Sequence, residues 1–142
     1  MADIFHDFII KAAPDRVFSG ISTPAGLDSW WTKASAGRAR VGEEYELNFG
    51  PKHIWHGRVT KCVAPTEFEL QILTTDPDWN ETRVGFRLRG EKTINVNFYH
   101  TGWPVANDHW RISTFCWAMY LRILRRHLEH GESVPFEQRL DV

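Results

Sequence analysis

The sequence has little of what marks several large protein classes. Its 142 residues include two cysteines, Cys62 and Cys116, which lie far apart and outside any CxxC pattern. We expect both thiols to be reduced and half-buried, which argues against a disulfide framework. No apolar run approaches the ~18 residues of a membrane span, and the opening residues lack a basic segment followed by an apolar stretch. The sequence therefore predicts a cytoplasmic protein without a membrane span.

An excess of charge of either sign is also missing. Lys and Arg number 17 and Asp and Glu number 18, which gives a formal net charge of −1. Because a protein that binds nucleic acid must neutralise phosphates, this balance predicts no nucleic-acid partner. Glycine-rich phosphate loops and the HExxH and GxSxG motifs are absent too, so the sequence predicts no cofactor and identifies no catalytic residue.

The histidines do not form a recognisable metal motif. His53 and His56 are three positions apart in a predicted strand, so their side chains point to opposite faces of the sheet. His127 and His130 share one face of a predicted helix, but no cysteine or carboxylate joins them there. We therefore expect no metal site.

What the chain does have is aromatic residues: 9 Phe, 7 Trp and 3 Tyr. Its content of 42% hydrophobic and 25% charged residues is that of an ordinary globular protein. The length fits a single domain, since domains average ~150 residues. Tryptophans are large and carry an N–H donor, so several of them in one small domain suit an incompletely filled pocket for apolar or aromatic ligands.

The first third of the chain predicts one strand and two short helices. Residues 3–11 read as a strand, and Pro14 is well placed to begin a helix. Thr23 and Pro24 repeat this start signal. We expect the second helix to carry Leu27 and the Trp30–Trp31 pair.

From Gly42 onward the hydrophobic period changes to two, which predicts an antiparallel meander of five strands with one wet face. The strands are expected at residues 44–49, 53–63, 67–72, 83–89 and 93–100. Glu67 and Glu69 fall on the wet face, where we expect solvated surface. His100 falls on the apolar face, where it either completes a hydrogen-bond network of the core or contacts a ligand.

After residue 104 the period returns to 3.6. An apolar stripe predicts a helix of ~22 residues that begins at an Asp108 N-cap and stops at Gly131. Residues 132–142 show no periodicity and are expected to be an irregular tail after a single domain of residues 1–131.

This order of elements predicts an α+β fold of the form β-α-α-β5-α. A six-stranded antiparallel sheet can bury its apolar face only by curving around the long C-terminal helix, and two short helices would close the end of the groove. An internal cavity is a natural by-product of that arrangement. The residues expected to line it or rim it are Trp30, Trp31, Phe49, Trp55, Phe86, His100, Trp103, Trp110 and Trp117.

Four ordered segments resemble one known group of proteins. They are residues 10–18, 23–31, 41–47 and 100–104, and the similarity extends from about residue 4 to residue 130. The chain resembles the START-like (SRPBCC) superfamily, in the branch of homologues of the activator of heat-shock protein 90 ATPase. The resemblance implies a helix-grip (START-like or Bet v-like) fold with a deep cavity between the sheet and the last helix. It implies no set of catalytic residues.

Three functions follow as hypotheses. The first is binding of a hydrophobic or aromatic small molecule in the cavity. The second is a co-chaperone-like module that binds a chaperone. The third is a cyclase- or dehydratase-type enzyme that uses His100 or a cavity carboxylate as its acid–base group. The chain is expected to be a monomer or a homodimer, because Phe5 and Ile9 point outward from the first strand and either pair two subunits or lie under the tail.

Overall fold

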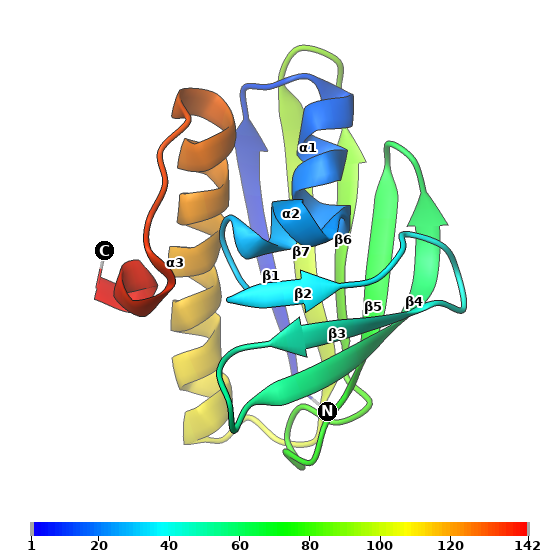
Figure 1. The fold of residues 1–142 in the computed structure, drawn as a ribbon, viewed down its shortest axis with the longest axis vertical. Coiled ribbons are helices and arrows are strands. Elements are labelled where there is room, and N and C mark those ends of the chain that lie inside the picture. The colour runs from blue at the N-terminus through cyan, green and yellow to red at the C-terminus, as the bar shows by residue number, and fades with distance from the viewer. Residues whose placement is uncertain (1, 142) are drawn as a thin grey trace.

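The computed structural model describes residues 2–141 and consists of one curved antiparallel sheet wrapped around a long helix (Figure 1). Seven strands follow each other across the sheet in the order β1-β7-β6-β5-β4-β3-β2. Their bounds are β1 Ala2–Ile10, β2 Ala34–Ala36, β3 Glu44–Asn48, β4 Ile54–Val63, β5 Glu67–Leu73, β6 Arg83–Arg89 and β7 Ile94–Trp103. The α+β helix-grip architecture is therefore confirmed.

The number of strands was wrong by one. The additional strand, β2, pairs with β3 at the edge of the sheet. Its three residues are Ala, Ser and Ala, which are too short and too small to produce an apolar alternation in the sequence. Strand β7 also continues past His100 to Trp103.

Both short helices begin with proline, as predicted. Helix α1 spans Pro14–Ser22, and α2 spans Pro24–Asp28 with the Thr23 hydroxyl accepting a hydrogen bond from the Gly26 N–H. Helix α2 ends before the Trp30–Trp31 pair, which lies in the following turn instead of on the helix.

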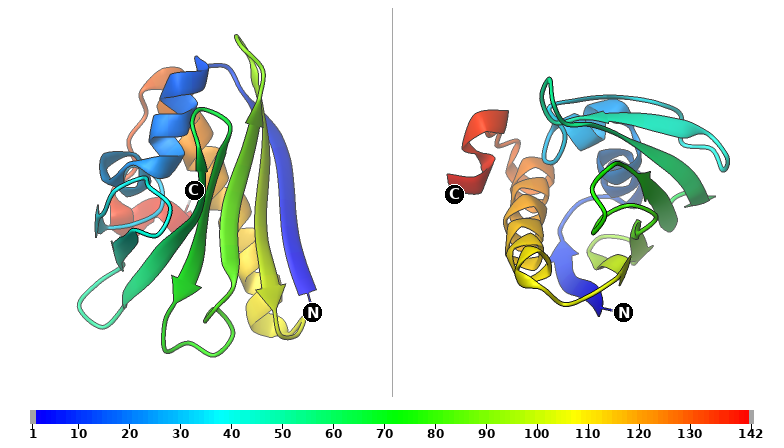
Figure 2. Two further views of the ribbon diagram at one scale, coloured as in Figure 1. Left: turned by 90° about the vertical axis from the view of Figure 1, so that its right-hand side faces the viewer. Right: turned by 90° about the horizontal axis from the view of Figure 1, so that it is seen from below.

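The long helix α3 spans Asp108–His130 and lies on the concave side of the sheet (Figure 2). Its N-cap is Asn107, one residue before the expected Asp108, and the Asn107 side chain accepts from the N–H of Trp110. Gly131 ends the helix with φ 70°, a left-handed conformation that favours glycine. The predicted stripe is confirmed, because Trp117, Leu121, Leu124 and Leu128 are buried.

The tail is more ordered than predicted. Phe136–Asp141 forms a 3-10 helix, η1, which packs against α3. The Arg139 side chain is only 6% exposed and donates hydrogen bonds to the carbonyls of Val134, Thr32 and Asp28. It thereby caps the C-terminal end of α2, where helix carbonyls lack partners. A single arginine anchors this segment, so no hydrophobic period marks it in the sequence.

The tail does not cover the first strand. Phe5 is 65% exposed and Ile9 is 49% exposed on β1, while η1 lies beside α3 and the turn after α2 (Figure 1). The alternative in which the tail covers these two side chains is thus excluded. Among the described residues, no helix is both long enough and apolar enough to span a bilayer.

Candidate ligand site in the aromatic core

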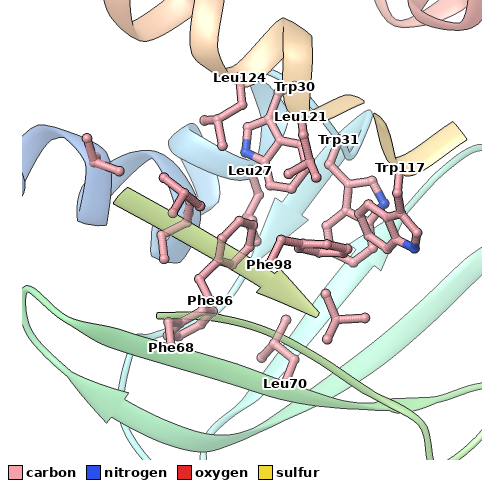
Figure 3. Packing of buried hydrophobic residues seen from close by; sticks show 14 of the residues in the cluster. Leu27, Trp30, Trp31, Phe68, Leu70, Phe86, Phe98, Trp117, Leu121 and Leu124 are labelled. Carbon is pink, nitrogen blue, oxygen red and sulfur yellow. The ribbon is translucent and has the colours of Figure 1, made fainter. Parts of the chain in front are cut away.

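The space between α3 and the sheet is filled by aromatic rings. Trp31 lies between Trp30 and Trp117, with centroid distances of 5.9 and 5.2 Å (Figure 3). Phe49 continues this series from Trp31 to Trp55, at 5.4 and 5.5 Å. The structure therefore brings together residues from the turn after α2, from β4 and from α3 that the sequence placed in one site.

The predicted site residues differ in how deeply they lie. Six are buried, namely Trp30, Trp31, Phe86, His100, Trp103 and Trp117. The remaining three, Phe49, Trp55 and Trp110, are partly buried and pack against the same core.

The void beside Trp30, Trp31 and Phe86 measures about 10 Å³. A single water needs at least ~10–15 Å³ and polar partners, so this apolar void leaves no room for a ligand. At this place the deep cavity implied by the family resemblance is closed. Its expected lining residues pack on one another, and Trp30 donates its indole N–H to the Gly20 carbonyl at 2.9 Å.

The ring of Trp79 occupies the other end of the aromatic core. Trp79 is only 8% exposed, yet it comes from the turn between β5 and β6 and not from a helix or strand. Its ring stacks on Trp117 at 5.7 Å, and it also lies 5.0 Å from Trp55, 4.5 Å from His100 and 5.9 Å from Trp103. Hydrophobic periodicity does not mark Trp79 as a site residue. The available signal was one tryptophan within an otherwise polar turn.

His100 connects this part of the core through hydrogen bonds. Its Nδ1 accepts from the indole N–H of Trp117 at 3.0 Å, so the ring proton lies on Nε2, which donates to the Thr82 hydroxyl at 2.8 Å. The Thr82 hydroxyl in turn donates to the carbonyl of Trp79 at 2.6 Å. Burial, together with the charge of His109, lowers the pKa of His100 to about 3. The imidazole is therefore neutral, and both of its nitrogens are engaged in the core.

Three indole N–H groups of the aromatic core have no hydrogen-bond partner in the described part of the chain. They belong to Trp79, Trp103 and Trp110, and all three nitrogens are buried. Trp79 contacts Trp103, and Trp103 in turn lies 5.3 Å from the ring of His109 in the first turn of α3. A buried donor without an acceptor costs ~1–3 kcal/mol, so three of them near one end of the core call for an explanation.

The turn that carries Trp79 is fastened to the start of α3. Oδ2 of Asp78 lies 2.9 Å from Nδ1 of His109 and accepts from the Asn107 amide at 3.2 Å. These two hydrogen bonds lower the pKa of Asp78. We call Asp78, Asn107 and His109 the loop latch, because the hydrogen bonds between their side chains join the turn to the start of the helix.

The loop latch overlaps a potential cation-binding group. Asp76, Asp78 and His109 each offer one ligand atom, and these atoms lie within 4.8 Å of one another. However, His109 Nδ1 already faces the Asp78 carboxylate, and a metal would have to replace that contact. In this structure the cluster fastens the loop.

The outer face of the sheet contains a carboxylate that the sequence analysis assigned wrongly. Glu69 is 3% exposed instead of solvated. Burial acts to raise the pKa of Glu69, but hydrogen bonds from Thr60, Tyr99 and Arg83 and the charge of Lys61 outweigh it, so the pKa is lowered. The Tyr99 ring lies directly against Gly85, where a side chain would collide with it, and the Tyr99 hydroxyl donates to Glu69.

Comparison with known proteins agrees with this architecture. The family described as Activator of Hsp90 ATPase homolog 1-like protein matches residues 11–129. The chain belongs to this family. The solution structure of the Aha1 dimer from Colwellia psychrerythraea is similar, with 29% identity, a TM-score of 0.84, and coverage of 94% of this chain and 100% of that one.

More distant members of the fold show lower identity. A Bacillus halodurans protein is 21% identical with a TM-score of 0.74 and covers 91% of this chain and 98% of its own. CalU16 from Micromonospora echinospora is 17% identical with a TM-score of 0.74, over 98% of this chain and 81% of that one. These two show the fold alone. None of the curated proteins matches the chain.

Proposed function

We propose that this member of the Activator of Hsp90 ATPase homolog 1-like family binds a flat, apolar small molecule that carries a hydrogen-bond acceptor. The ligand takes the place that Trp79 fills in this structure, against Trp55, His100, Trp103 and Trp117. The observation that carries the proposal is the set of three buried indole N–H groups without an acceptor.

The proposed ligand class follows from those donors and their surroundings. Trp117 stacks on the ring of Trp79 at an interplanar angle of 22°, Trp55 contacts it at a tilt of 55°, and the same two rings would contact another flat ring. The N–H groups of Trp103 and Trp110 would gain a carbonyl, phenolate or carboxylate oxygen, which recovers part of the cost of burying them unpaired. An apolar pocket with a few directed polar groups is the usual form of a small-molecule site.

The Trp79 turn is the proposed route of entry. Like the Trp30–Trp31 turn, it lies outside the helices and strands, and the loop latch and Thr82 join it to its neighbours. Opening the latch would withdraw Trp79 and leave a space of about one indole ring. Connecting segments are the parts of a fold that open at low free-energy cost.

His100 has a positioning role in this proposal. Because both of its nitrogens are hydrogen-bonded within the core, we assign it no acid–base chemistry and rank the cyclase hypothesis below ligand binding. Chaperone binding is consistent with the family description and remains the second hypothesis. The dimer described for the Colwellia protein supports a homodimer here as well, and we include that assembly in the proposal.

Two probes of nearly equal shape test the ligand class by calorimetric titration: 2-acetylnaphthalene, which has an acceptor, and 2-isopropylnaphthalene, which has none. We expect the ketone to bind about 5- to 10-fold more tightly, as one recovered hydrogen bond would give. Trp103→Phe should remove this preference. Trp30→Phe is the matched control, because the Trp30 N–H already has its acceptor, and it should leave the preference unchanged. No binding of either probe up to its solubility limit, to the native chain or to Trp79→Ala, would overturn the proposal.

A further inference from the structure

The free edge of β1 is a surface that the ligand site does not use. Strand β1 ends the sheet, and among the described residues it pairs with β7 and with no other strand. An unpaired edge presents N–H and C=O groups that can template another strand. Its exposed side chains, Phe5 and Ile9, are among the large apolar residues that face solvent.

The charge on this edge favours a particular partner. Along the exposed row of β1 the residues are Asp3, Phe5, Asp7, Ile9 and then Lys11. If a second copy of β1 pairs antiparallel around a two-fold axis at Asp7, Phe5 faces Ile9 of the other copy, and Asp3 faces Lys11. Each of these pairs occurs twice because of the symmetry. A shift by two residues in either direction would place Asp3 or Asp7 opposite Ile9, so the register is specified.

In this pairing the two Asp7 carboxylates lie close together and repel each other. A nearby arginine, Arg125, can offset this repulsion. Asp7 and Arg125 of α3 line the same two grooves, of about 270 and 400 Å³, along β1. The Nε of Arg125 is buried and has no hydrogen-bond partner in the described part of the chain. The two Arg125 guanidinium groups, one from each copy, would therefore lie near the two Asp7 carboxylates on the axis and compensate their charge.

We infer that a second copy of this chain docks on β1, so that two seven-stranded sheets join edge to edge in the register centred on Asp7. This inference rests on the homodimer proposed above and adds the surface and the register. It is independent of the ligand, because the Trp79 turn lies between β5 and β6 and not on β1.

Cysteine cross-linking tests the register in a Cys62→Ser, Cys116→Ser background. Residues on the two-fold axis of an antiparallel pair have Cα atoms about 4.5–5.5 Å apart, within the range of a disulfide. Asp7→Cys should therefore oxidise to a covalent dimer. Phe5→Cys alone should not, since its two copies would be about 13 Å apart along the strands. A mixture of Phe5→Cys and Ile9→Cys should cross-link as a heterodimer.

Analytical ultracentrifugation of the native chain separates the two proposals. A monomer at all concentrations would overturn both the homodimer and this surface. A dimer that forms none of the predicted cross-links would keep the homodimer and overturn the surface. We further expect Ile9→Lys to raise the dimer dissociation constant by about 10-fold or more, because it places a charge opposite Phe5. Ile54→Lys on β4, at a similarly exposed isoleucine, should leave the constant unchanged.

Discussion

The indole N–H of Trp117 donates to Nδ1 of His100, which joins α3 to β7 inside the core at a distance of 3.0 Å. The same imidazole reaches the Trp79 turn through Thr82. One buried side chain thus connects the helix, the sheet and the turn that surround the proposed ligand. Its loss should affect stability as well as binding.

We expect His100→Leu to lower the free energy of unfolding by about 2–4 kcal/mol, because it leaves the Trp117 N–H and the Thr82 hydroxyl buried without their partner. Urea unfolding followed by circular dichroism measures this. His100→Gln, whose amide can accept and donate, should lose less. His53→Leu is the control, since His53 is exposed and should change stability by less than about 0.5 kcal/mol. Equal effects at both positions would contradict the role of the network.

The pH dependence of stability follows from the same residue. The pKa of His100 is lowered from 6.5 to about 3 in the folded state, so the unfolded chain binds more protons between these values. The stabilisation is fully present above pH ~6.5 and decreases by up to about 1.4 kcal/mol per pH unit as the pH falls toward the folded-state value. Subtracting the profile of His100→Gln removes the contribution of the other groups. Parallel profiles for the two proteins would show that His100 does not cause the slope.

Trp79→Ala should remove a ring that fills the core. We expect a loss of about 3–5 kcal/mol in unfolding free energy, because the surrounding rings cannot collapse fully into the space. Indole added in excess should bind the vacated space and raise the melting temperature of this variant more than that of the native chain, where Trp79 must first leave. A loss below about 1 kcal/mol would mean that the ring does not fill the core.

The buried carboxylate on the outer face gives a separate test. Glu69→Ala should cost about 2–4 kcal/mol, since it leaves the Arg83 charge and the Thr60 and Tyr99 hydroxyls without their common acceptor. Glu67→Ala is the matched control on the same strand. Its side chain is partly exposed and paired with Arg87 at 3.9 Å, so we expect a change below about 1 kcal/mol. Thermal unfolding of the two variants side by side gives the comparison.

The sequence predicts most of the fold, because alternation and helical periodicity mark elements that bury one face. It predicts five meander strands and the long helix, and it places Trp30, Trp31, Trp103 and Trp117 inside. It does not predict β2, whose short side chains bury little, or η1, which a single buried arginine holds. Elements without a periodic apolar face leave no such signal.

The candidate site is less accessible from the sequence, because it depends on how side chains meet across the fold. Periodicity cannot place Trp79, which belongs to a turn, in the centre of the aromatic core. Alternation assigned Glu69 to the wet face, which is right for its direction and wrong for its exposure, because Arg83 of the adjacent β6 and Tyr99 of β7, one strand further, cover it. The sequence also offers no way to see that the predicted cavity is filled by its own lining.

In the proposed function, a ligand with an acceptor replaces Trp79 and satisfies the neighbouring indole N–H groups. Amide and indole ¹⁵N–¹H correlation spectra of the native chain, titrated with 2-acetylnaphthalene, measure this most directly. We expect large downfield shifts of the Trp103 and Trp110 indole protons and a change at Trp79, while the Trp30 indole proton keeps its hydrogen bond to the Gly20 carbonyl and its shift. Shifts confined to residues outside the aromatic core, or equal shifts with 2-isopropylnaphthalene, would contradict it.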